Sequence, residues 1–246
     1  MRSETESGNR SVEANARLEL ATLYRMLAHF RMSDLIDTHI SSRVPGTSDH
    51  FLINAYGVLF HEMSPDKLVK IDSSGQVLQE SGKQSMRINR AGFVIHSAVH
   101  NARHDLSCVI HTHTPDGIAV ACEKSGLLPI SQHALKFYKR IGYHDYEGIA
   151  LDLDERSRLV ANLGGHQAMI LRNHGLLVAG RTVAEAFLNL MYLERACQIQ
   201  MKLTARQSDM IFPTAEVCER TARQYEEAEG LEHADLVWQS MRRLLN

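Results

Sequence analysis

The fold of this chain is decided by the stretch Ser107-Cys108-Val109-Ile110-His111-Thr112-His113. Its first half is short, apolar and partly β-branched, which predicts a buried strand that runs into the histidines. Side chains two positions apart on a strand point to the same face, so His111 and His113 present two imidazoles side by side. Two imidazoles at one strand end form half of a metal site.

His174 is the best candidate for a third ligand. It follows the apolar run Ala168-Met169-Ile170-Leu171 and precedes Gly175, which opens a second apolar run ending at Gly180. We therefore expect His174 in a turn between two strands, where it completes a site for a divalent metal ion with His111 and His113.

Length and composition favour a globular protein that acts on a small molecule. The 246 residues fit one medium α/β domain or two small ones, and 44% hydrophobic with 23% charged residues is too apolar for disorder. A formal net charge of −2 argues against nucleic acid or a membrane as the main partner. The chain has 14 histidines, several of them between His96 and His174, which favours a metal or acid–base site.

The cysteines and the first residues point to a reduced, cytoplasmic protein. Cys108, Cys122, Cys197 and Cys218 have no metal-ligand spacing. Residues 1–10 are polar, lack the apolar core of a signal peptide and predict a disordered tail. No uninterrupted apolar stretch approaches the roughly 20 residues that span a bilayer.

The remaining pattern predicts one domain in which helices cover an antiparallel sheet. Helices are expected after residue 15, over 91–103, from Pro115, and after Thr182, where Glu185 completes a capping box. Strands are expected over 38–44, 51–54 and 58–60, with a hairpin over 69–78. Residues 214–232 are charged and predict a peripheral helix or a subunit contact.

Several motifs in this order resemble the class II aldolase and adducin-head family, from about Leu20 to Gln200. They are Thr38-His39-Ile40-Ser41, Phe51-Leu52-Ile53-Asn54 with Tyr56-Gly57, His96-Ser97-Ala98-Val99-His100, His111-Thr112-His113-Thr114, Tyr143-His144-Asp145-Tyr146-Glu147-Gly148 and Arg172-Asn173-His174-Gly175. The resemblance implies an α/β fold, a three-layer α/β/α arrangement with a mainly antiparallel central sheet, over residues 11–246 with a C-terminal helical extension. It also implies a homotetramer with a metal on His111, His113 and His174 near a subunit interface, zinc first, with iron(II) or manganese as alternatives.

Two departures from the family pattern bear on the substrate. Sugar-phosphate aldolases of the family carry an acid–base glutamate nineteen residues before the first histidine of the pair, and that count reaches Gly92 here. Their phosphate cradle, a Gly-Asn-x-Ser turn plus two serines, is replaced by Thr38-His39-Ile40-Ser41 and by Arg90 and Ala91. Because this phosphate cradle is missing, a small hydroxy or keto acid is expected as the substrate in place of a sugar phosphate, and Arg90 is suited to attract a carboxylate.

The remaining site residues are assigned by motif and chemistry. We expect His39, Tyr56, Gly57, Arg90 and His96 to bind the substrate, whereas His100 is expected to be structural. The absent acid–base group is expected to be replaced by one of three side chains, namely His144, Glu147, or His133 acting across a subunit interface.

Three functions follow from these observations. The first is a metal-dependent carbon–carbon lyase of the aldolase or decarboxylase type. The second is a non-haem iron oxygenase, because three neutral histidines with open positions also hold iron(II). The third is a non-enzymatic, adducin-like assembly or binding module, which the absence of an acid at Gly92 favours and the full histidine set disfavours.

Overall fold

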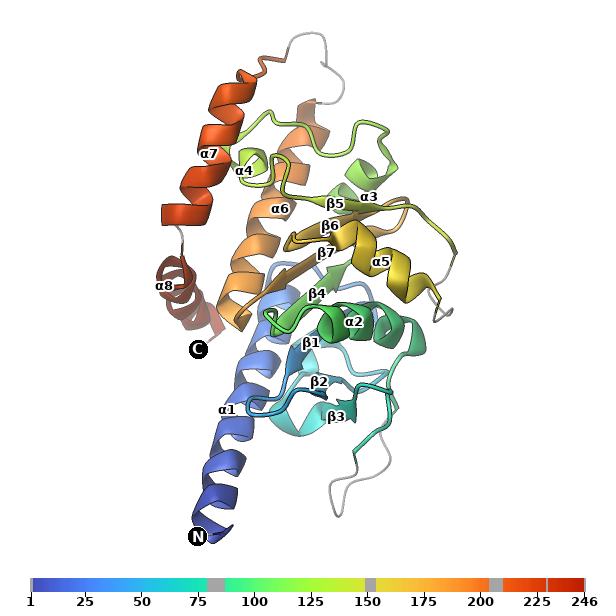
Figure 1. Ribbon diagram of the computed structural model, residues 1–246, viewed down its shortest axis with the longest axis vertical. Helices are drawn as coiled ribbons and strands as arrows, with labels where there is room; N and C mark the ends of the chain where they lie inside the picture. The colour runs from blue at the N-terminus through green and yellow to red at the C-terminus, as the bar shows by residue number, and fades with distance from the viewer. Residues whose placement is uncertain (1, 79–86, 149–153, 204–209, 229, 246) are drawn as a thin grey trace.

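A seven-stranded sheet in the order β3-β2-β1-β4-β7-β6-β5 forms the middle layer of the protein (Figure 1). The computed structural model describes residues 2–78, 87–148, 154–203, 210–228 and 230–245. The elements in chain order are α1 Arg2–His29, β1 His39–Arg43, β2 His50–Asn54, η1 Phe60–Glu62, η2 Pro65–Lys67, β3 Leu68–Asp72, α2 Arg90–Ala102, β4 Cys108–Thr112, α3 Pro115–Cys122, α4 Gln132–Leu135, β5 Gly142–His144, α5 Glu155–Leu163, β6 Ala168–Leu171, β7 Gly175–Gly180, α6 Val183–Leu203, α7 Ala215–Ala228, α8 Leu231–Arg242 and η4 Arg243–Leu245.

Strand β4 lies at the centre of the sheet, paired with β1 on one side and β7 on the other. The strand pairs are antiparallel except β5 with β6, which run parallel and are connected through α5. A crossover helix is the usual way to join parallel neighbours. The mainly antiparallel sheet predicted from the sequence is thus confirmed.

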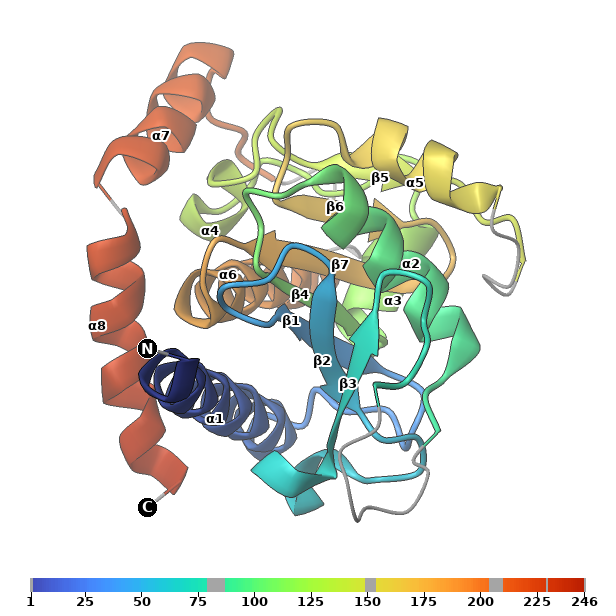
Figure 2. The ribbon, with the colours of Figure 1, turned by 60° about the horizontal axis from the view of Figure 1, so that its bottom comes forward.

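Alternation along the strands separates two helical layers. Val109 packs in a cluster with residues of α2 and α5, whereas Ile110 packs in the cluster that includes residues of α1 and α6. Because successive strand residues face opposite sides, each central strand contributes to both clusters. Figure 2 shows α2 and α5 together on one side of the sheet, with α1 and α8 on the other. This is the predicted three-layer α/β/α arrangement.

Helix α1 is tied to the sheet by one buried hydroxyl. Tyr24 Oη accepts hydrogen bonds from the backbone amides of Ile40 at 2.8 Å and Asn54 at 3.1 Å, and contacts Asn54 Oδ1 at 2.8 Å. Tyr24 also donates to the carbonyl oxygen of Ile40. These contacts fix the end of β2 and the residue of β1 that follows His39.

Two predicted segments differ from the structure. Helix α1 begins at Arg2, so residues 2–10 are helical where a disordered tail was expected. Extending an existing helix gains one backbone hydrogen bond per residue fixed, and no proline interrupts this segment. Residues 58–60 form no strand. Phe60 instead starts the 3-10 helix η1, where its ring packs edge-on against Tyr24 at 4.7 Å between centroids.

Other local predictions are confirmed. The hairpin over 69–78 forms, with the Asp72 amide donating to Gln76 O and a bridge between Ile71 and Val77. Thr182 Oγ1 accepts from the Glu185 amide at 3.1 Å and caps α6, although the Glu185 carboxylate bonds the amide of Arg181 instead of that of Thr182. Among the described residues, no helix combines the length and apolar character needed to cross a membrane.

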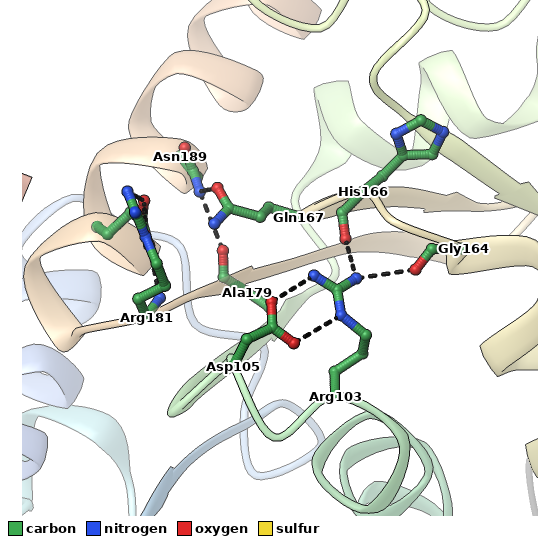
Figure 3. Close-up of polar contacts among 9 residues, drawn as sticks. Arg103, Asp105, Gly164, His166, Gln167, Ala179, Arg181 and Asn189 are labelled. Carbon is green, nitrogen blue, oxygen red and sulfur yellow. Dashed lines mark hydrogen bonds and ion pairs between the residues drawn. The ribbon is translucent and has the colours of Figure 1, made fainter. Parts of the chain in front are cut away.

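Arg103 braces the end of the sheet where β4 begins (Figure 3). Its guanidinium is paired with Asp105, with one N–O distance of 2.7 Å, and donates to the carbonyl oxygens of Gly164 at 2.8 Å and His166 at 2.9 Å. This network joins the end of α2 to the turn between α5 and β6. It fixes the helical layer that carries His96 against the sheet.

Candidate metal centre

Most of the predicted site residues meet at one end of the sheet. His39 of β1 lies opposite His111 of β4, and the beginning of β7 lies beside the end of β4. The turn that carries His174 joins β6 to β7 at the same end. The antiparallel register therefore brings residues separated by more than 60 positions in the chain to one edge.

His111, His113 and His174 form a compact group, which we call the histidine triad. One ligand nitrogen of each lies within 4.8 Å of the others. The ring centroids are 4.6 Å apart for His111 and His113, 4.7 Å for His111 and His174, and 4.9 Å for His113 and His174. This spacing suits three imidazoles around one ion.

Hydrogen bonds on the far sides of two rings decide where their protons lie. His111 Nδ1 is 3.0 Å from the carbonyl oxygen of Leu176, and His113 Nδ1 is 3.0 Å from Asp34 Oδ2. Since carbonyl and carboxylate oxygens accept, each Nδ1 carries a proton. When both rings are neutral, both Nε2 atoms hold lone pairs, and these atoms face each other at 2.8 Å. Two lone pairs this close are unfavourable without a proton or cation between them, so the residues fit a divalent ion.

Burial keeps two of the triad histidines, His111 and His174, in the form that binds metal. Burial lowers the pKa of His111 well below its ordinary value, with further contributions from His174 and His113. Burial also lowers the pKa of His174 to about 4. Both rings are therefore neutral at pH 7, as a metal ligand must be.

The turn around His174 has two demanding backbone positions. Asn173 has a φ of 57°, in the left-handed region that asparagine tolerates better than most residues. A Cβ on Gly175 would lie 2.3 Å from the carbonyl oxygen of Thr112 and 3.2 Å from His113 Cδ2. Glycine is required here because β7 approaches β4 closely where the ligands converge.

His39 fills the space in front of Gly92. A Cβ on Gly92 would lie 2.5 Å from His39 Nδ1, so no side chain fits at position 92 while this ring stays in place. His39 is 2% exposed, and neither ring nitrogen has a protein hydrogen-bond partner. Burial lowers its pKa to about 4. Where sugar-phosphate aldolases were expected to carry the acid–base glutamate, this protein thus has a glycine faced by a buried histidine, which lies beside His111.

His96 and His100 belong to α2, and the ring of His96 lies 6.1 Å from that of His39 between centroids. Ser41 Oγ contacts His96 Nδ1 at 2.6 Å and His100 Nε2 at 2.7 Å. His100 also stacks on Phe51 at 4.5 Å, in keeping with a structural role, and the remaining ring nitrogens, His96 Nε2 and His100 Nδ1, both lack a protein hydrogen-bond partner. Burial lowers the pKa of both histidines, that of His100 to about 3.

Tyr56, Gly57 and Arg90 lie on the surface at the triad's end of the sheet. Tyr56 and Gly57 form the turn after β2, with a φ of 92° at Gly57, and the Tyr56 side chain is 47% exposed. Arg90 is exposed and begins α2, two residues before Gly92. These positions are compatible with substrate contact, which stays a prediction.

The segment after β5 lies beside the triad of its own chain. The ring of Tyr146 is 6.2 Å from that of His174. His144 is buried, with Nε2 3.2 Å from Glu155 Oε1. Glu147 pairs with Arg158, whose hydrogen bonds lower the pKa of Glu147. His144 and Glu147 remain candidates for proton transfer, but the Glu147 carboxylate already accepts hydrogen bonds from Arg158.

His133 is not placed with these residues within one chain. It lies on α4, and its ring is 5.4 Å from that of Tyr192 on α6. Lys136 and Phe137, three and four residues later, line a cavity at the other end of the sheet. The predicted role of His133 therefore depends on a neighbouring subunit.

That cavity, of about 470 Å³, lies where β4 begins and β7 ends, away from the triad. Arg103 is paired with Asp105, Arg140 with Glu219 and Glu226, and Arg181 with Glu185. These arginines are therefore engaged within the chain.

Two acidic residues that contact the triad or the residues flanking His113 were not expected from the sequence. Asp34, which accepts from His113, lies in the loop after α1, and Glu194 of α6 accepts from Thr112 and Thr114. Neither belongs to a local motif with the histidines. The signals that remain are an aspartate in a polar loop and a glutamate on the buried, mainly apolar face of a helix.

Comparison with known proteins identifies the family. The family described as Class II Aldolase and Adducin N-terminal domain matches residues 18–201. A crystal structure of an aldolase II superfamily protein from Pseudomonas syringae is 49% identical, with a TM-score of 0.89 over 95% of this chain and 93% of that one. L-fuculose 1-phosphate aldolase from Glaciozyma antarctica is 26% identical, with a TM-score of 0.84 over 96% of this chain and 92% of that one.

Alpha-adducin from Rattus norvegicus is 43% identical over 77% of this chain, which corresponds to 26% of the adducin. The similarity thus extends to an L-fuculose 1-phosphate aldolase and to an adducin, and it agrees with the motifs, the sheet and the histidine triad. The chain belongs to the class II aldolase and adducin N-terminal domain family.

Proposed function

We propose that this protein is a metal-dependent carbon–carbon lyase of the aldolase or decarboxylase type that acts on a small hydroxy or keto acid or a related carbonyl compound. The observation that carries the proposal is the histidine triad, in which the Nε2 lone pairs of His111 and His113 face each other at 2.8 Å. Zinc is the first choice for the ion, with iron(II) or manganese as alternatives. When bound, it would polarise a carbonyl oxygen and stabilise the negative charge that develops there.

The protein's own residues would bind and orient the substrate. His39 and His96 carry buried nitrogens without a protein partner, which suits hydrogen bonds to substrate oxygens. Arg90 would attract a carboxylate. For proton transfer we favour His144 over Glu147, because Glu155 orients His144 whereas Arg158 pairs with Glu147. His133 would act from a neighbouring subunit.

An assembly or binding role is the second candidate, favoured by 43% identity to alpha-adducin. The two functions are separated by elemental analysis of untagged protein prepared without chelator, followed by turnover assays on hydroxy and keto acids. Bound metal with turnover supports the lyase, and metal-free protein without turnover supports the binding role. Oxygen consumption by iron-loaded protein would instead support an oxygenase.

We expect no useful cleavage of fuculose phosphate, ribulose phosphate or similar sugar phosphates. Position 92 carries no acid, the His39 ring fills the space in front of it, and the serine cradle for phosphate is absent. Steady-state assays with added zinc check this. Turnover in the usual range of about 1–1,000 per second would show that another group replaces the missing acid for these substrates.

We also expect the active unit to be a homo-oligomer, a tetramer with sites near subunit interfaces. Large apolar side chains are exposed at the triad's end of the sheet, with Leu35 at 75%, Tyr56 at 47% and Tyr146 at 53%. A neighbouring subunit would cover such groups and exclude water from the site. Light scattering at low micromolar concentration measures the mass, and a stable monomer that turns over substrate would contradict a shared site. The cytoplasm is the proposed compartment.

A further inference from the structure

Glu194 is a buried carboxylate on the opposite face of the sheet from the triad imidazoles. It belongs to α6 and is 1% exposed. Its Oε1 accepts hydrogen bonds from Thr114 Oγ1 at 2.5 Å and Thr112 Oγ1 at 3.3 Å. Thr112 ends β4 and Thr114 precedes α3, so Glu194 holds the chain on both sides of His113.

The hydroxyl of Thr114 is committed to this contact. Thr114 is the N-cap residue of α3, where threonine ordinarily accepts a hydrogen bond from the first turn of its own helix, but its side chain makes no such bond. A Cβ on Gly117 would lie 2.6 Å from Thr114 Oγ1 and 2.8 Å from side-chain carbons of Leu176. The packing at Thr114 is therefore tight.

Helix α3 connects this contact to the third triad residue. At its far end, the carbonyl oxygen of Ala121 accepts from the backbone amide of Asn173 at 3.2 Å, and Cys122 Sγ accepts from Asn173 Nδ2 at 3.5 Å. Asn173 immediately precedes His174. The short helix thus runs from the residue after His113 to the residue before His174, and Glu194 anchors its first end.

A carboxylate in this position is costly, which argues against a packing role alone. Burial raises the pKa of Glu194 to about 7, although both threonine hydroxyls act in the opposite direction. An apolar side chain of similar size would fill the same volume without desolvating a charge.

We propose that Glu194 is a positioning residue of the metal centre, which sets the location of His113 relative to His174 by holding Thr112, Thr114 and thereby α3. The role rests on the proposed metal-binding function. It assigns to the centre a residue that touches neither the ion nor the substrate.

The test compares Glu194→Gln, Glu194→Met and Thr114→Val with the wild-type protein. Metal affinity is measured by competition with a chelator, and the absorption spectrum of cobalt(II)-loaded protein reports the coordination geometry. Glutamine keeps an oxygen for both hydroxyls, so Glu194→Gln should stay within about threefold of wild type. Glu194→Met should lose roughly 10–100-fold in affinity and change the cobalt spectrum. Thr114→Val, a smaller change, should shift both measurements in the same direction.

Glu185→Met is the matched control. Glu185 is also a buried glutamate of α6, but it binds Arg181 at the other end of the sheet. This variant should lose stability while keeping wild-type metal affinity. Equal weakening in Glu185→Met and Glu194→Met, or unchanged affinity in Glu194→Met and Thr114→Val, would overturn the positioning role alone. Absence of metal binding in the wild-type protein would overturn the proposed function and this role with it.

Discussion

Alanine at any one of His111, His113 and His174 should reduce bound metal from one ion per chain to nearly none. Each substitution removes a third of the donor set that the sheet assembles, and two nitrogens hold a divalent ion far more weakly than three. The affinity loss should exceed the roughly 10–100-fold typical of residues that only support a ligand. Elemental analysis after gel filtration, with a chelator competition for each variant, measures it.

The same variants should lose the stabilisation that metal gives the wild-type protein. An ion that binds only the folded state adds about 2.7 kcal/mol to the free energy of unfolding when its free concentration is about 100 times its Kd. His104→Ala is the control, because His104 is exposed and lies before β4, at the other end of the strand. Full metal content in all three triad variants would show that the ion, if any, binds elsewhere.

Gly175→Ala should be the most damaging single-methyl change at the centre. The new Cβ would lie 2.3 Å from the carbonyl oxygen of Thr112. Because this oxygen belongs to the backbone of β4, it cannot move away as the end of a flexible side chain could. Strands β4 and β7 would have to separate where the triad converges. We expect a loss of about 3 kcal/mol in the free energy of unfolding, which corresponds to about 6–12 °C in melting temperature, together with weakened metal binding.

Gly165→Ala is the matched control for that change. A Cβ on Gly165 meets no atom within 4 Å, and this glycine lies in the turn between α5 and β6. Its effect should stay within about 0.5 kcal/mol. If thermal melts place Gly175→Ala within the same range, the close approach of the two strands is not a constraint on the fold.

The parts of the fold that follow from local pattern were predictable. The alternation around Val109 and Ile110 identifies a central strand, and the spacing of His111 and His113 identifies one face of it, because side-chain period depends only on neighbouring residues. The apolar runs on both sides of His174 placed it in a turn between two strands, and the family motifs added the three-layer arrangement. Residues 58–60 were wrongly predicted because a short apolar run does not distinguish a strand from a 3-10 turn.

The rest of the centre depends on contacts that no local pattern encodes. Asp34 meets His113 across 79 positions, and Glu194 meets Thr114 across 80. The closeness of His39 to Gly92 follows from packing between β1 and α2. His133 lies on α4 beside Tyr192 and away from the triad, which its position in the sequence did not reveal. These relations appear only when the three layers are put together.

The sheet order also determines when the metal centre can form during folding. β1, β2 and β3 are neighbours both in the chain and in the sheet, as are β5, β6 and β7. β4, in contrast, pairs with β1 and β7, from which it is separated in the chain by several other helices and strands. Closing long loops is slow because entropy is lost before the contacts form. The triad lies at the seam between β4 and β7, so it is completed only when the two halves have joined. We therefore expect bound metal to slow unfolding and to leave the rate of folding nearly unchanged. The ion would then stabilise the native state after the transition state has been passed, without taking part in the folding nucleus.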